Sequence, residues 1–99
     1  MLNAENTRLC WEVLSRYGVK NQYYKIIEEA AELIEAASRM LQENGDEENF
    51  LEEMVDVLVV CQQHFNNERI TDAEINDRAR AKLLRALGGN YAANVHKKK

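Results

Sequence analysis

The sequence contains no proline, and it has only four glycines and two cysteines among 99 residues. Proline interrupts helices, whereas Ala, Leu and Glu, which are abundant here, favour them, so the composition predicts an all-α protein. Two cysteines cannot supply a disulfide framework. We expect Cys10 and Cys61 to be reduced thiols packed within helices of a cytoplasmic protein.

Two further absences limit the possible partners. No apolar run approaches the ~20 residues needed to span a bilayer, and no secretory signal opens the chain, so we expect no membrane association. The formal net charge is -4, and the only basic run is Lys97-Lys98-Lys99, which argues against binding to polymeric nucleic acid. The length predicts one helical domain at residues 1–89, followed by a flexible basic tail at 90–99.

Apolar periodicity and turn signals predict four helices. We expect them at residues 3–17, 21–43, 47–67 and 72–87. Gly18 and Asn44-Gly45 are typical helix stops, whereas Asp46 and the capping box from Thr71 to Glu74 are typical helix starts. Short connections predict a four-helix bundle, and the small size of the chain predicts that oligomerisation completes it.

The second and third predicted helices each carry two carboxylates three residues apart. They are Glu29 with Glu32 and Glu53 with Asp56, and this spacing puts both members of a pair on one helix face. Asp56 stands in an otherwise apolar run, where an ionised carboxylate is costly unless it is neutralised. The short turn at residues 44–46 would let the two helices run antiparallel and bring all four acids together. Their mutual repulsion would raise some pKa values unless a divalent cation lies among them.

Other side chains of these helices are predicted to point elsewhere. Glu28 and Glu35 project away from the apolar face of the second helix, toward solvent. On the third helix, Val59 projects to the outer side near Glu52 and Gln63, and an apolar residue there hints at a subunit interface.

A basic ridge runs along the fourth predicted helix. It consists of Arg78, Lys82 and Arg85, spaced so that they share one side. Such a ridge can be a solvated surface, or it can bind phosphate groups. Both interpretations remain open from the residues alone.

Together, these residues resemble the MazG-like all-α nucleoside triphosphate pyrophosphohydrolases. The signature of that family is E-x-x-E followed, one to three dozen residues later, by E-x-x-D. Here it reads Glu29-Ala-Ala-Glu32 and Glu53-Met-Val-Asp56, on successive predicted helices. The likeness spans residues 23–85, because basic residues also precede the first motif and follow the second.

The resemblance implies Mg²⁺-dependent cleavage between the α- and β-phosphates of a nucleoside triphosphate, giving a monophosphate and pyrophosphate. It implies a homodimer or homotetramer. The implied metal ligands, which also carry the catalysis, are Glu29, Glu32, Glu53 and Asp56. The implied substrate-binding residues are Lys25, Lys82 and Arg85. Neither the preferred base nor the general base among the carboxylates follows from the sequence.

Three alternatives compete with this interpretation. Phosphoribosyl-ATP pyrophosphohydrolases share the paired motifs but usually carry Tyr-His at the third and fourth positions after the aspartate, where this chain has Val59-Val60. A non-catalytic oligomeric helical bundle that binds a partner would need no acid at Asp56. A di-iron bundle is disfavoured because neither histidine has a glutamate three residues before it.

Overall fold

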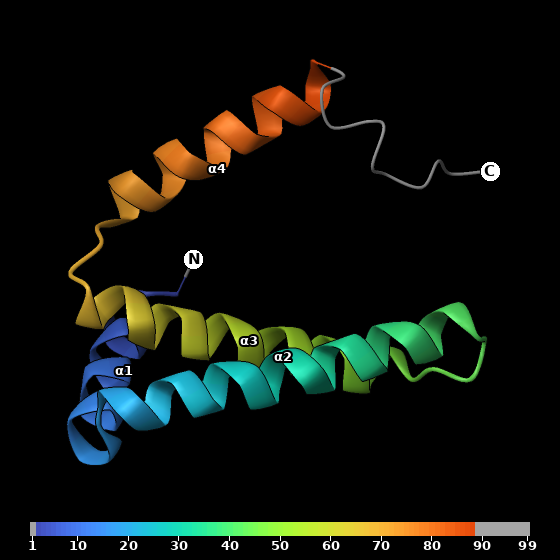
Figure 1. Cartoon of the computed structure of the whole chain (residues 1–99), viewed down its shortest axis with the longest axis horizontal. Coiled ribbons are helices and arrows are strands. Elements are labelled where there is room, and N and C mark those ends of the chain that lie inside the picture. Colours follow the sequence, from blue (N-terminus) through green and yellow to red (C-terminus); the bar gives the residue numbers. More distant parts are fainter. Residues whose placement is uncertain (1, 89–99) are drawn as a thin grey trace. The chain divides into compact units, whose positions relative to one another are not determined.

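A computed structural model describes residues 2–88, and this part of the chain is helical with no strand (Figure 1). The helices are α1 (Ala4–Tyr17), α2 (Val19–Leu41), α3 (Glu47–Asn67) and α4 (Asp72–Leu87). The predicted all-α class and the predicted number of helices are confirmed. The predicted tail at 90–99 lies outside the described residues. Within residues 2–88, no helix combines the length and the hydrophobicity needed to pass through a bilayer.

Local hydrogen bonds fix where three of the helices begin. The side-chain oxygens of Asn3, Asp46 and Thr71 each accept a hydrogen bond from a backbone N–H two or three residues further along the chain. α2 begins differently, directly after Gly18, whose φ of 85° is open to glycine at little cost. It therefore starts at Val19 rather than at the predicted Asn21, and it ends at Leu41 rather than Glu43.

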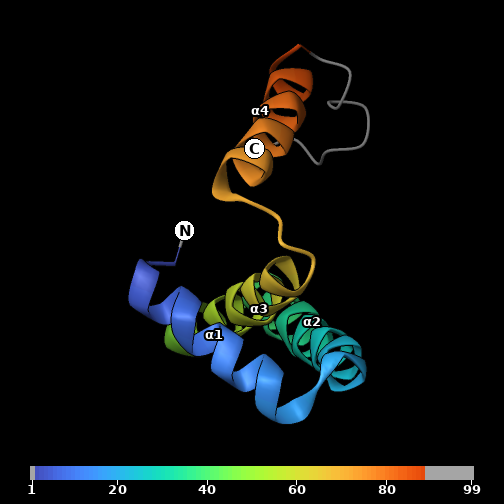
Figure 2. The ribbon, with the colours of Figure 1, turned by 90° about the vertical axis from the view of Figure 1, so that its left-hand side faces the viewer.

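The chain forms two compact units, Met1–Arg69 and Ile70–Lys99. In the first unit, α2 and α3 run antiparallel through the turn at residues 42–46, and α1 packs mainly against α3 (Figures 1 and 2). The second unit contains α4, and none of that helix's residues is buried. The single domain at residues 1–89 and a bundle of all four helices remain predictions.

The core of the first unit is small and partly polar. Its buried apolar side chains are Cys10, Leu14, Ala36 and Val60. Cys10 and the half-buried Cys61 are free thiols, as the sequence predicts.

Buried amides connect the helices of this unit. Gln22 Nε2 donates to the Val60 carbonyl at 3.1 Å, which joins α2 to α3. Gln62 Nε2 donates to Asn66 Oδ1 at 2.9 Å, and Asn66 Nδ2 donates to the Thr7 carbonyl at 3.0 Å, which joins α3 to α1. Buried polar groups cost stability unless they are hydrogen-bonded, so these pairs favour one arrangement of the three helices.

Candidate metal centre between two helices

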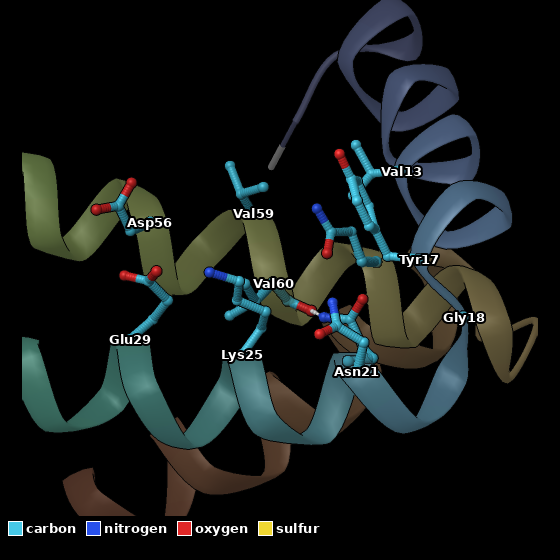
Figure 3. Close-up of a pocket in the computed structure, with 11 residues that line it drawn as sticks. Val13, Tyr17, Gly18, Asn21, Lys25, Glu29, Asp56, Val59 and Val60 are labelled. Carbon is cyan, nitrogen blue, oxygen red and sulfur yellow. Dashed lines mark hydrogen bonds between the residues drawn. The ribbon is translucent and has the colours of Figure 1, made fainter.

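Four carboxylates meet near the middle of the interface between α2 and α3. Glu29 and Glu32 come from α2 and Glu53 and Asp56 from α3, and one oxygen from each lies within 4.8 Å of the others. Because the helices are antiparallel, Glu29 lies opposite Asp56 and Glu32 lies opposite Glu53. Figure 3 shows Glu29 and Asp56 pointing toward one another. The structure thus brings together the four acids as the sequence predicts; their role in metal binding stays a prediction.

The carboxylates differ in their surroundings. Glu29 and Glu53 are half-buried, whereas Glu32 is exposed. Burial raises the pKa of Glu29 and of Glu53, and the nearby charges of Glu32 and Asp56 raise both further. Glu28 and Glu35 are exposed, as predicted, and each forms an ion pair with a basic residue of α2.

Two carboxylate oxygens lack a hydrogen-bond partner in the part of the chain that the structure describes. Oε2 of Glu29 and Oε2 of Glu53 are buried, and neither has a hydrogen-bond partner within residues 2–88. An unpaired buried acceptor is costly, and an ionised one is more so. Acidic clusters on protein surfaces are common without a metal, but solvent satisfies their oxygens. These two oxygens are deprived of solvent, and a cation would satisfy both.

The arrangement of the four oxygens fits a hard divalent cation. Mg²⁺ binds oxygen ligands at about 2.1 Å, so two ligands of one ion lie no more than about 4.2 Å apart. The observed limit of 4.8 Å exceeds this by an amount that small rotations of the glutamate side chains can remove. The donor set contains only carboxylates, which suits Mg²⁺ better than softer metals.

A cavity of about 530 Å³ extends from the carboxylates along α2 and α3 toward α1. Figure 3 shows Glu29 and Asp56 at one end, Lys25 in the middle and Tyr17 and Asn21 at the other end. The Lys25 ammonium lies 3.5 Å from Glu28 Oε1, and both side chains are about half exposed. Of the predicted substrate-binding residues, Lys25 lies in the same cavity as Glu29 and Asp56.

The other two predicted substrate-binding residues, Lys82 and Arg85, lie on α4 in the second unit. Both are exposed, as is Arg78 on the same helix. Their role in phosphate binding stays a prediction.

The sequence did not reveal the amide-lined end of the cavity. Helical projection placed Val59 and Gln63 on the outer side of the third helix, and this was wrong. Val59 is half-buried and Gln63 is only 6% exposed, because α1 packs across that side of α3. The available signal was the pair of amides at Gln62 and Gln63 directly after an apolar run.

Comparisons of the chain with protein-family models, with curated proteins and with solved structures found no match. Function is therefore inferred from the residues of the site and from their geometry. What the described residues define is an all-α protein with a carboxylate cluster that opens onto a cavity.

Proposed function

We propose that this protein is a Mg²⁺-dependent nucleoside triphosphate pyrophosphohydrolase that releases pyrophosphate and leaves a nucleoside monophosphate. One observation carries the proposal: four carboxylates converge within 4.8 Å, and two of their oxygens are buried without a hydrogen-bond partner among the described residues. The resemblance of the paired E-x-x-E and E-x-x-D motifs to the MazG-like enzymes supports the same activity. We place the protein in the cytoplasm, where nucleotides and Mg²⁺ are abundant.

Each residue of the site has a definable role in this reaction. Glu29, Glu32, Glu53 and Asp56 would hold the cation. When bound, Mg²⁺ would offset the charge of the triphosphate and acidify a water bound to it. Lys25 lines the middle of the cavity and can exchange its contact with Glu28 for one with a phosphate oxygen. Lys82 and Arg85 are proposed to hold the remaining phosphates.

The proposed enzyme is a homodimer or homotetramer, and α2 carries a surface suited to this. A row of exposed residues runs along α2 at alternating spacings of three and four residues, the pattern of a coiled-coil contact. We call this row the apolar seam; apart from Ser38, its side chains are mostly apolar, and it consists of Tyr24, Ile27, Ala31, Ile34, Ser38 and Leu41. Ile27 and Ile34 are each 67% exposed and Leu41 is 87% exposed. A stripe of this kind is costly in water and marks an interaction surface.

The same seam favours the non-catalytic alternative, in which the chain is a helical bundle that binds a different protein. One assay distinguishes the hydrolase from the non-catalytic bundle. Purified protein is incubated with canonical and modified nucleoside triphosphates and with phosphoribosyl-ATP, with Mg²⁺ or with chelator, and pyrophosphate is measured. We expect release that requires Mg²⁺. No release from any of these compounds would refute the hydrolase proposal and leave the binding bundle.

A further inference from the structure

The cavity beside the carboxylates has a chemically different far end. Asn21, Gln22 and Gln63 contribute three carboxamides there. Val13, Val59 and Val60 provide apolar walls, and the exposed Tyr17 stands at the edge (Figure 3). Apolar walls with a few polar groups are typical of sites that bind small molecules.

Gln63 is the most informative residue of this end. It is only 6% exposed, and it lines the cavity. Its neighbour Gln62, which is equally deep, is paired with Asn66. Gln63 borders the large cavity and also a second one of about 310 Å³ between α1 and α3, so its amide lies in a wall that faces open space. A carboxamide in a cavity wall can both donate and accept hydrogen bonds, so it can pair with a polar group of a ligand.

Gln22 is held in one orientation. Its Nε2 donates to the Val60 carbonyl at 3.1 Å, which leaves its Oε1 as the group free to accept a hydrogen bond. The far end therefore offers one oriented acceptor together with amides that can both donate and accept. A heterocycle with both kinds of group along one edge matches this set.

The two ends of the cavity are separated by a definite length. Asn21 and Glu29 are eight residues apart on α2, which corresponds to about 12 Å along the helix axis. Lys25 lies halfway between them. A ligand that fills the cavity thus carries phosphate groups at the carboxylate end within reach of Lys25, then a spacer, and a hydrogen-bonding ring at the amide end. A nucleotide has these parts in this order.

We propose that the amide-lined end binds the base of the nucleotide and that Gln63 and Asn21 determine which base is preferred. This inference rests on the proposed function for the identity of the reaction. In it, Gln63 and Asn21 pair with donors and acceptors on the edge of the base, Gln22 accepts one hydrogen bond, and Tyr17 covers one face of the ring. The enzyme consequently discriminates among bases, and a triphosphate without a base gains nothing from this end.

The test replaces Gln63 by methionine, which has a similar shape and no hydrogen-bonding amide. Gln62→Met is the matched control, since Gln62 is a neighbouring buried amide that pairs with Asn66 and does not line the cavity. For both variants, KM and kcat are measured with ATP, GTP, CTP and UTP and with inorganic tripolyphosphate. Thermal unfolding is recorded in parallel.

For Gln63→Met we expect KM for the preferred nucleotide to rise about tenfold or more, because a base edge then lacks its partner. The preference among the four nucleotides should shrink, while kcat and the rate with tripolyphosphate change little. Its melting temperature should change little, because methionine fills a similar volume. Gln62→Met should melt at a lower temperature and keep the parent's KM and base preference.

Binding of the four nucleoside monophosphates in chelator, measured by calorimetry on parent and Gln63→Met, separates this inference from the proposed reaction. If the parent hydrolyses nucleotides and Gln63→Met keeps its KM and base preference, the inference is overturned and the function stands. If the parent hydrolyses none but binds one monophosphate and Gln63→Met binds it about tenfold more weakly, the inference stands and the hydrolase proposal falls. If the parent neither hydrolyses nor binds nucleotides, both fall.

Discussion

Glu29 on α2 and Asp56 on α3 face one another across the helix interface, with carboxylate oxygens less than 4.8 Å apart. Among residues 2–88, no lysine or arginine forms an ion pair with either. Two like charges at this separation raise the free energy of the folded protein. The hairpin imposes the encounter, because the turn at residues 42–46 fixes which parts of the two helices meet. The same encounter becomes favourable once a cation lies between them.

Removing one charge from the cluster should strongly reduce turnover. We expect Asp56→Asn, which keeps the shape of the side chain, to lower Mg²⁺-dependent pyrophosphate release by about 100-fold or more, since metal stabilisation of a phosphoryl transition state is worth several kcal/mol. Helicity, measured by circular dichroism, should be unchanged. Glu52→Gln is the control, because Glu52 is exposed on the same helix and lies outside the cluster. Equal activity of Asp56→Asn and parent would show that the cluster is not the catalytic centre.

The stability of the metal-free protein should depend on pH through Glu29 and Glu53. Folding raises the pKa of both above the ordinary value of 4.5, so the folded state binds these protons more tightly than the unfolded state does. Their contribution is fully present below pH 4.5 and is lost as the pH rises through the raised values. In chelator, we expect the melting temperature of Glu53→Gln to fall less than that of the parent over this range. Parallel curves for parent and variant would contradict the burial of Glu53, and Glu52→Gln should follow the parent.

Magnesium should stabilise the fold as well as support turnover. A ligand that binds only the folded state adds about 2.7 kcal/mol at a concentration 100 times its Kd. We therefore expect Mg²⁺ to raise the melting temperature of the parent at pH 8, and to raise it less near pH 5, where protons compete for Glu29 and Glu53. Asp56→Asn should lose most of the increase. An equal increase in parent and variant would indicate ion binding elsewhere on the chain.

The apolar seam of α2 should be covered by a second copy of the chain. Ile34 lies near its middle and is 67% exposed in the single chain. We expect Ile34→Glu to shift the protein from dimer or tetramer to monomer in analytical ultracentrifugation, because a charge placed in an apolar contact must be desolvated. Glu35→Gln changes the adjacent, exposed position outside the seam and should leave the oligomer intact. A parent that sediments as a monomer would contradict the oligomeric proposal directly.

Local signals made part of this structure predictable. Asp46 and Thr71 begin helices through hydrogen bonds to backbone groups a few residues away, so the sequence alone locates α3 and α4. The carboxylate cluster was predictable because a short turn forces two amphipathic helices to be antiparallel. The burial of Gln63 was not, since it depends on where α1 packs, and the periodicity of α3 contains no information about that contact.

The turn that sets the carboxylate register depends on Gly45. A Cβ at this position would lie 2.5 Å from Met40 Sδ and 2.8 Å from the Met40 backbone N and Cα. The thioether can move away, but the backbone of Met40 belongs to the last turn of α2 and cannot move alone. We expect Gly45→Ala to lower the free energy of unfolding by about 1–3 kcal/mol, as overpacking does elsewhere. Because relief of the clash shifts α3 along α2, the increase in melting temperature produced by Mg²⁺ should shrink as well. Asn44→Ala, in the same turn, removes side-chain atoms and adds none, so it should preserve that increase. Denaturation curves of the two variants, recorded with and without Mg²⁺, decide whether the turn controls the cluster.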